Sequence, residues 1–369
     1  MTGPVMRWPL TVPVISDGVV TLRAHVPGDI DGMLEMAQDP DMVRWTSVPT
    51  PHHRRLSEQY AFTIVPRGWD EGTHRGWAIE VEGRYAGNVD IRQQPIGDIG
   101  FALHPWARGR GVMSRAVRLA IDWAFTEGDV EIVHWRAHVG NEASLRVAHS
   151  TGFTLHGLAP GMLHERGRVL DAWTGSIRFG DAPFPRQPWA EATVLETERL
   201  RLRPYTDADI PRLVEACSDP LTRHFLAALP RPYTPATARA YLDDCLWQAA
   251  TGAKATWVVA DRESDELLGN IAVMDLVGTA ADHGEIGYWA HPDARRRGVM
   301  TEATRMIVRH ALAADGLDRR RLSLYAAVDN PASNAVALAS GFTRYGTQRA
   351  AERLGDGSFD DLNGYEIVR

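Results

Sequence analysis

Alternation of apolar and polar residues predicts a short β-strand early in each half of the chain. The segments Val19–Ala24 and Arg199–Pro204 have the two-residue period of a half-buried strand. An amphipathic helix is predicted after each strand, over Asp29–Gln38 and over Ala208–Ser218, with Asp207 or its neighbour near the second N-cap. Both halves of the chain therefore open with a strand and a helix.

A β-hairpin is predicted next in each half. The first pairs Trp77–Glu82 with Tyr85–Ile91 and turns at Glu82-Gly83. The second pairs Trp257–Asp261 with Leu267–Val273 through a longer turn.

The segment that follows the first hairpin has the clearest periodicity. One face of a predicted strand carries Ile99, Phe101 and Leu103, and the other face carries Asp98, Gly100 and Ala102. An amphipathic helix is predicted from the apolar spacing of Val112, Ala116, Leu119, Ala120 and Trp123. Residues 299–314 repeat this helix. The remaining predicted elements are strands at 130–139 and 320–328, helices at about 142–150 and 331–340, and strands that begin at Phe153 and Phe342.

The two halves are copies of one unit. Residues 98–113 match residues 285–300 without a gap. Shorter matches occur in the same order: Leu22-Arg23 with Leu202-Arg203, Asp39-Pro40 with Asp219-Pro220, Trp77 with Trp257, Gly87-Asn88 with Gly269-Asn270, Gly152-Phe153 with Gly341-Phe342, and Asp171 with Asp361. Each copy is long enough to be a whole domain, which excludes a solenoid of short repeats.

The segment between the copies is rich in proline, with Pro183, Pro185 and Pro188. Proline fixes φ and lacks an amide donor, so an extended linker is predicted at 181–192. The predicted domains are residues 1–180 and 193–369.

Composition narrows the class of protein. The chain of 369 residues has a net charge of −7 and two cysteines, Cys217 and Cys245. It shows no apolar run long enough to span a membrane, and its first ten residues show no secretory apolar segment. These features predict a cytoplasmic protein without a disulfide framework, without a membrane partner and without a nucleic-acid partner.

An arginine- and glycine-containing segment precedes the same helix in both copies. It contains Arg108, Gly109, Gly111 and Met113 in the first copy. The second copy has Arg295, Gly298 and Met300 at the matching places. A glycine turn that opens a helix presents unpaired N–H groups at the positive end of the helix dipole, which suits a pyrophosphate. The segment is neither a P-loop nor a dinucleotide fingerprint.

These motifs resemble the acetyl-CoA-binding segment of the GNAT superfamily of N-acetyltransferases. The resemblance rests on Ile-Gly-Phe/Tyr, His-Pro and Ala-Arg-x-Arg-Gly-Val-Met, and on the later Asn-x-Ala-Ser and Gly-Phe. The opening of the second copy at 196–204 resembles the RimJ/RimL-type branch. Met113 and Met300 stand where the family usually has glycine or alanine, and a longer side chain there is expected to crowd the pyrophosphate.

The resemblance implies an α/β (α+β) fold of two tandem GNAT domains packed as a pseudo-dimer. Each domain has a mixed, mostly antiparallel, splayed sheet flanked by helices. Acetyl-CoA is the implied co-substrate. The residues expected to hold it are Leu103, Arg108, Gly109, Arg110, Gly111, Val112, Met113, Ser114 and Asn141, and in the second copy Ala290, Arg295, Arg296, Arg297, Gly298, Val299, Met300, Thr301 and Asn330.

The implied chemistry is direct attack of an amine on the thioester, which needs a base and donors for the developing oxyanion. Asp98 and Glu285 occupy matching positions where an acidic base is expected by similarity; the alternative is a solvated carboxylate at a strand end. The oxyanion donor is expected to be a backbone N–H near Leu103 or Ala290.

Two asparagine–serine pairs have both a structural and a functional interpretation. Asn141 with Ser144 and Asn330 with Ser333 fit a helix N-cap and its first turn. By similarity, the asparagine side chain contacts the pantetheine arm and the serine hydroxyl approaches the sulfur of the cofactor.

Histidine and tryptophan positions complete the candidates. Ten of the fourteen histidines precede the linker, and His104 and His291 precede prolines. No pair has metal-ligand spacing, so no metal is predicted and these histidines are expected at the surface or lining a pocket. Trp45, Trp69 and Trp106 have no counterparts in the second copy and either line an acceptor pocket or pack in a core.

Two functions remain open from the sequence. The first is transfer of an acetyl group to a primary amine, either a small molecule or a protein N-terminus, by one or both copies. The second is a regulatory or scaffold protein that binds CoA or a phosphorylated ligand without turnover. The acceptor is expected to meet the variable segments 41–75 and 223–256. Either a monomer with an internal pseudo-dimer or a homodimer is consistent with the duplication.

Overall fold

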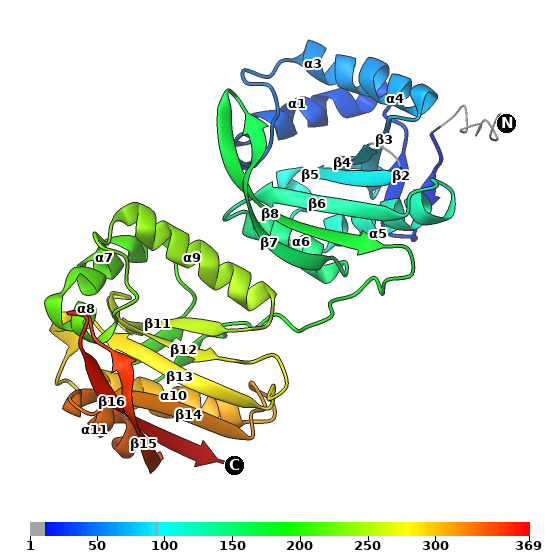
Figure 1. The fold of residues 1–369 in the computed structure, drawn as a ribbon. Coiled ribbons are helices and arrows are strands. Elements are labelled where there is room, and N and C mark those ends of the chain that lie inside the picture. Colours follow the sequence, from blue (N-terminus) through cyan, green and yellow to red (C-terminus); the bar gives the residue numbers. More distant parts are fainter. Residues whose placement is uncertain (1–11, 93–94) are drawn as a thin grey trace. The chain divides into compact units, whose positions relative to one another are not determined.

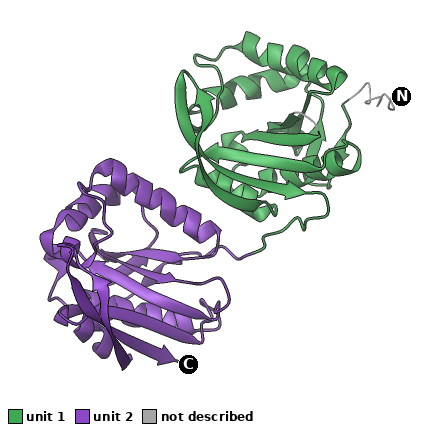
Figure 2. Ribbon diagram, in the orientation of Figure 1, with its two compact units in different colours: residues 1–186 green, residues 187–369 purple. Residues whose placement is uncertain are grey.

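The computed structural model describes residues 12–92 and 95–369 and contains two compact units, residues 1–186 and 187–369 (Figure 2). The expectation about the first ten residues lies outside the described residues. The division between the units falls inside the segment predicted as a linker. No residue from 181 to 192 belongs to a helix or a strand.

Each half of that segment is anchored on its own unit. Arg118 donates a hydrogen bond to the carbonyl of Pro183 at 3.2 Å, within the first unit. The amide of Ala190 donates to the carbonyl of Ala249 at 2.8 Å, and Ala190 is part of the core of the second unit. The free part of the connection is therefore shorter than the proline-rich segment.

The first unit is built on an eight-stranded sheet in the order β1-β2-β3-β4-β5-β6-β8-β7 (Figure 1). Its strands are β1 (Ile15–Ser16), β2 (Thr21–Arg23), β3 (His74–Val81), β4 (Arg84–Arg92), β5 (Ile96–Leu103), β6 (Ile132–His138), β7 (Thr154–Glu165) and β8 (Arg168–Arg178). All neighbouring pairs are antiparallel except β5 and β6.

The second unit repeats this topology, read from β9: β9-β10-β11-β12-β13-β14-β16-β15. Its strands are β9 (Leu195–Glu196), β10 (Leu200–Arg203), β11 (Ala255–Asp261), β12 (Leu267–Met274), β13 (His283–Ala290), β14 (Arg321–Ala327), β15 (Thr343–Arg353) and β16 (Phe359–Val368). Here β13 and β14 form the parallel pair. The predicted splayed, mostly antiparallel sheet is confirmed in both copies.

Helices cover both faces of each sheet (Figure 1). The first unit has α1 (Ile30–Gln38), α2 (Pro40–Trp45), α3 (Arg54–Gln59), a π-helix (Tyr60–Ile64) and α4 (Val65–Glu71) before the hairpin, and α5 (Val112–Thr126) and α6 (Glu142–Ser150) after it. The second has α7 (Ile210–Ser218), α8 (Pro220–Phe225), α9 (Pro235–Ala250), α10 (Val299–Leu312) and α11 (Pro331–Ala339). Short 3-10 turns precede α1, α5, α7 and α10.

The predicted helices are confirmed, with ends shifted by a few residues. The helices within 41–75 and 223–256 were not predicted. These segments were expected only as variable regions, but they fold into α2–α4 and α8–α9. The hairpin turn at Glu82-Gly83 is confirmed: both residues have positive φ, 54° and 73°, as a two-residue type I′ turn requires.

The duplication extends to individual core contacts. Trp77 and Trp257 are fully buried at matching positions. The indole N–H of Trp77 donates to the carbonyl of Pro13 at 3.1 Å, and that of Trp257 donates to the carbonyl of Thr193 at 2.9 Å. The same anchor therefore fixes the segment before the first strand in both copies.

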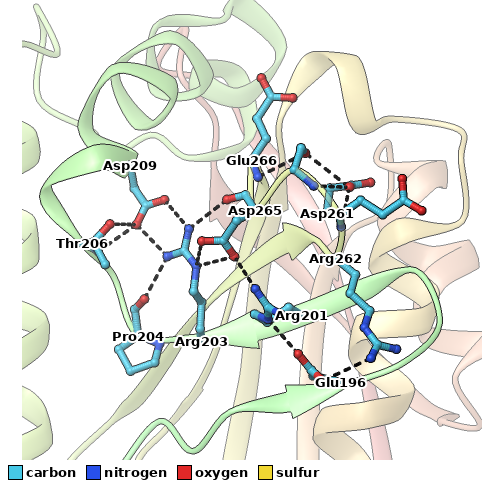
Figure 3. Close-up of polar contacts among 12 residues, drawn as sticks. Glu196, Arg201, Arg203, Pro204, Thr206, Asp209, Asp261, Arg262, Asp265 and Glu266 are labelled. Carbon is cyan, nitrogen blue, oxygen red and sulfur yellow. Dashed lines mark hydrogen bonds and ion pairs between the residues drawn. The ribbon is translucent and has the colours of Figure 1, made fainter.

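An arginine of the second strand in each unit forms an ion pair that stabilises the fold. Arg203 donates two hydrogen bonds to the carboxylate of Asp209, at 2.9 and 2.8 Å, and reaches Asp265 at 3.0 Å (Figure 3). Arg23 holds Asp29 in the same way in the first unit, at 2.7 and 2.9 Å. Each pair ties a strand to the turn that starts the first helix.

Candidate active site

In each unit the parallel strands part after three paired positions. The β5–β6 register runs from Ile96↔Ile132 to Asp98↔His134. The β13–β14 register runs from His283↔Arg321 to Glu285↔Ser323. Beyond these pairs the two strands diverge, and we call the opening between them the fork. Both predicted bases, Asp98 and Glu285, lie at the last paired position, where the fork begins.

Backbone alternation directs the expected oxyanion donors into the fork. The amide of His104 donates to the carbonyl of Ala86 at 2.8 Å, on the β4 side of β5. The amide of His291 donates to the carbonyl of Leu268 at 2.8 Å in the same way. Because successive residues of a strand point their N–H groups to opposite sides, those of Leu103 and Ala290 face the fork.

The glycine segment forms the predicted turn before α5 and α10. Gly109 and Gly111 both have φ of 72°, and the matching Arg296 and Gly298 have φ of 59° and 72°. Arginine thus takes the left-handed conformation that glycine takes in the first copy. Gly111 and Gly298 cap their helices without a side-chain hydrogen bond, and a Cβ on either would meet nothing within 4 Å. Each helix therefore begins at a glycine with open space at its Cβ position and with no side chain bound at the cap, which leaves its first N–H groups available to an anion.

Arg108 and Arg295, predicted to bind the cofactor, form ion pairs within the protein. Arg108 contacts Asp39 at 2.6 Å and Asp41 at 3.1 Å, and its Nε donates to the carbonyl of Leu103 at 3.2 Å. Arg295 contacts the carboxylate of Asp219 and donates to Thr222 Oγ1 at 2.9 Å. These side chains hold the glycine turn in place, because carboxylates already satisfy their charge.

The role of Asp39 and Asp219 here was not predicted from the sequence. Each also caps a helix, accepting from the amide of Met42 at 3.1 Å or of Thr222 at 2.9 Å. Although burial alone raises the pKa of these carboxyls, the hydrogen bonds from the paired arginines and the helix amides lower it below the usual range. The Asp-Pro match between the copies was the available signal.

Met113 and Met300 do not crowd the turn. Both side chains are buried, and the sulfur of Met300 lies against Gly269 of β12, within the core. The expectation of crowding is therefore wrong, because the first turn of the helix directs these side chains toward the sheet. Val112 and Val299 are also buried.

The other predicted cofactor residues surround the turn. Arg110 pairs with Glu82 at 3.0 Å, and the carbonyl of Arg297 accepts a hydrogen bond from Arg199 at 3.1 Å. The hydroxyl of Ser114 contacts that of Ser150 at 2.8 Å. Thr301 follows Met300 in the first turn of α10.

The asparagine–serine pairs have the predicted N-cap geometry. Asn141 accepts from the amide of Ser144, and Asn330 from that of Ser333, both at 3.1 Å. The hydroxyl of Ser144 accepts from Trp135 at 3.0 Å, whereas that of Ser333 lies 3.0 Å from Tyr288 on β13. Burial raises the pKa of Tyr288 to about 12, so this phenol stays protonated at neutral pH.

The two predicted bases differ in their surroundings. Asp98 Oδ2 lies 3.0 Å from Arg92 and 3.0 Å from Arg136. Among the described residues, Glu285 forms no ion pair. Burial raises the pKa of Glu285, and the negative charges of Asp275 and Glu352 raise it further.

His104 and His291 are buried, which corrects their expected place at the surface or in a pocket. Their Nε2 atoms lie 3.4 Å from Glu35 of α1 and Glu215 of α7, so each ring packs between a strand end and a helix.

Trp69 also lies in a core. It packs edge-to-face against Trp77 and Trp123, with ring centroids 4.9 and 5.2 Å away. Trp106 lies under the guanidinium groups of Arg84 and Arg110, and Trp45 packs against His138. In the described part of the chain, no group of three or more His, Cys, Asp or Glu side chains could hold a metal ion. No described helix is long and apolar enough to cross a membrane.

Each unit places a fork between two parallel strands beside the start of a helix that has no side-chain cap. This arrangement is that of an α/β fold of the acetyltransferase type, and the chain contains it twice. The family model described as "Acetyltransferase (GNAT) domain" matches residues 20–154 and again 199–343, and the chain belongs to this family.

Similar proteins each match about one unit or less. The chain is 31% identical over 179 residues to the uncharacterized N-acetyltransferase YoaA of Bacillus subtilis (strain 168). This match covers 48% of this chain and 97% of YoaA. It is 35% identical over 106 residues to the ribosomal-protein-serine acetyltransferase of Escherichia coli (strain K12), covering 29% of this chain and 57% of that protein. Among solved structures, the chain is similar to RimL, a ribosomal L7/L12 alpha-N-protein acetyltransferase in complex with coenzyme A. The sequence identity is 22% and the TM-score is 0.44, and the match covers 48% of this chain and 98% of the RimL chain.

Proposed function

We propose that this protein is an acetyl-CoA-dependent N-acetyltransferase that acetylates a primary amine by direct attack. Membership of the GNAT family supports the reaction class. The observation that carries the proposal is the Glu285 carboxylate at the mouth of its fork. It has no ion-pair partner among the described residues, and the N–H of Ala290 faces the same opening.

Acetyl-CoA is the co-substrate in this proposal and supplies an activated thioester. The glycine turns before α5 and α10 suit its pyrophosphate, because several helix N–H groups there have no partner inside the helix. The buried Met113 and Met300 leave this space open.

Glu285 is the proposed proton acceptor. An amine is protonated at neutral pH and must lose a proton before its nitrogen can form a bond to the acyl carbon. A carboxylate whose pKa is raised by burial, and then by Asp275 and Glu352, is a better base than an exposed one. As the C–S bond breaks, negative charge develops on the sulfur, and the Ser333 hydroxyl beside Tyr288 is proposed to donate a hydrogen bond to it. The proton that the attacking nitrogen loses on becoming an amide then passes to the thiolate, which leaves as free CoA thiol.

The proposed acceptor is a small-molecule amine or a protein N-terminus. The similarity to a protein named for ribosomal-protein-serine acetylation supports the N-terminus, but a free amine has the same reacting group.

The Glu285→Gln variant tests the function. Release of free CoA thiol is measured with acetyl-CoA and a library of amines and peptide N-termini. Turnover is expected to fall by about 100- to 10,000-fold, the usual contribution of a general base, while calorimetric binding of acetyl-CoA is unchanged.

The control is Glu127→Gln, which changes an exposed glutamate directly after α5. Binding of acetyl-CoA without turnover by the wild-type chain on any amine would instead establish the regulatory alternative.

A further inference from the structure

The two forks differ at positions that the strand registers make equivalent. Asp98 pairs with Arg92 across β5 and β4, and Glu285 pairs with Met274 across β13 and β12. On the other side of the fork, Asp98 pairs with His134 and Glu285 with Ser323. Two residues further along these strands, on the same face, stand Arg136 in the first unit and Tyr325 in the second. Two arginines in the first fork therefore replace a methionine and a tyrosine in the second.

Both arginines bind the carboxylate that would serve as the base. Their NH2 groups each lie 3.0 Å from the same oxygen, Asp98 Oδ2. The side chain of Asp98 is 15% exposed, whereas those of Arg92 and Arg136 are 44% and 38% exposed. Arg136 donates a hydrogen bond to this oxygen, and Arg92 forms an ion pair with it. Asp98 is therefore engaged by two side chains of its own unit, whereas Glu285 forms no ion pair among the described residues.

A second carboxylate fixes Arg92 in this position. Arg92 Nε lies 3.3 Å from Asp90 Oδ1, and the other oxygen of Asp90 lies 3.2 Å from His74 and 3.4 Å from Tyr60. Asp90 stands opposite Gly100, and its equivalent opposite Gly287 is Ala272. The second unit therefore has neither the arginine nor the carboxylate that contacts it at these positions.

The charge near the carboxylate also differs between the two forks. In the first fork the two guanidinium groups of Arg92 and Arg136 balance the carboxylates of Asp98 and Asp90, so a protonated amine meets no unpaired negative charge in this cluster. An amine that enters the second fork meets Glu285, with Asp275 and Glu352 near enough for their charges to act on it.

We propose that acetyl transfer takes place in the second unit, and that Arg92 and Arg136 silence the first unit as a transferase by occupying Asp98. This rests on the proposed function and assigns it to one of two similar sites. Arg92 and Arg136 are positioning residues in this account, since they act through Asp98. The first unit keeps its glycine turn and its uncapped α5, so it retains the features expected to bind acetyl-CoA.

Matched base variants test where transfer takes place. Asp98→Asn is expected to leave turnover unchanged, while Glu285→Gln lowers it by about 100- to 10,000-fold. The acidic limb of the pH–rate profile is expected to persist in Asp98→Asn and to disappear in Glu285→Gln. Equal losses in the two variants, or a loss in Asp98→Asn alone, would overturn the assignment while leaving the acetyltransferase function intact. A wild-type chain without turnover would refute the function itself.

A graft tests the role of the arginines. The substitutions Arg92→Met and Arg136→Tyr are introduced into the Glu285→Gln chain, giving the first fork the residues of the second. Turnover is expected to rise at least about tenfold above the Glu285→Gln chain and to disappear again on addition of Asp98→Asn. Arg84→Met with Arg168→Met is the control, since these strand arginines make no contact with Asp98. A graft that keeps its thermal unfolding midpoint and its acetyl-CoA binding but gains no turnover would overturn the silencing role.

Discussion

At the scale of single residues, the position of a carboxylate does not determine its chemistry. Asp98 and Glu285 occupy equivalent ends of a three-residue parallel register. The first is held by two arginines, and the second is half-buried without an ion-pair partner among the described residues. Sequence comparison finds both carboxylates, because their flanking motif repeats. The arginines come from two neighbouring strands, and only the registers show that they meet Asp98.

The raised pKa of Glu285 predicts how stability depends on pH. Between its ordinary value of 4.5 and the higher folded value, the folded unit binds more protons at this site than the unfolded chain does. The contribution of Glu285 to stability is therefore present at low pH and is lost as pH rises through that interval. Glutamine has no proton to lose, so Glu285→Gln is expected to raise the unfolding midpoint at pH 7 and to have little effect below the ordinary range of glutamate.

Differential scanning calorimetry from about pH 4 to pH 8 checks this prediction. Glu263→Gln, which changes an exposed glutamate, serves as the control. A lower midpoint for Glu285→Gln at pH 7 would show that the fold stabilises the charged carboxylate, and the base assignment would lose its support.

At the scale of elements, the glycine turn is held by a neighbouring helix. Asp219 caps α8 through the amide of Thr222 and also binds Arg295, the first residue of the turn segment. Asp39 likewise caps α2 through the amide of Met42 and binds Arg108. One carboxylate thus fixes the start of a short helix and the loop expected to bind pyrophosphate.

Two substitutions at Asp219 separate these roles. Asparagine keeps the capping oxygen and removes the charge, so Asp219→Asn is expected to keep its stability while the Kd for acetyl-CoA rises about fivefold, the equivalent of ~1 kcal/mol. Asp219→Ala loses the cap as well and is expected to lower the free energy of unfolding by about 1 kcal/mol. Urea unfolding and calorimetric titration measure the two effects. Wild-type affinity in both variants would mean that the ion pair does not position the turn.

Elements with a strong local pattern were predictable, and those shaped by distant contacts were not. The hairpin at Glu82-Gly83 and the helix from Val112 were predicted because turn residues and apolar spacing specify them locally. Helix α9 has apolar residues without a single face, and only three of its residues are buried, so its pattern gave no clear signal. His104 and His291 carry no local mark of burial, because the covering glutamates belong to α1 and α7.

At the scale of the whole molecule, the two units share the backbone of the glycine turn and differ in the side chains at the fork. The turns before α5 and α10 share their dihedral angles even where Arg296 replaces Gly109. Backbone N–H groups do not depend on residue type, so a unit whose carboxylate is engaged by arginines can still bind a pyrophosphate at its glycine turn. Binding and turnover should therefore have different stoichiometries in this chain.

Calorimetric titration is expected to find two equivalents of acetyl-CoA per chain. Gly111→Trp and Gly298→Trp each place a large side chain in the open space before a helix, so each is expected to remove one equivalent. Only Gly298→Trp should also remove turnover, because the second unit carries Glu285. Gly180→Trp controls for the conformational cost of a side chain at positive φ, since Gly180 has φ of 87° and likewise nothing near its Cβ. One equivalent that only Gly298→Trp removes would show that the first unit does not bind acetyl-CoA. No equivalents in the wild-type chain would contradict acetyl-CoA as the co-substrate.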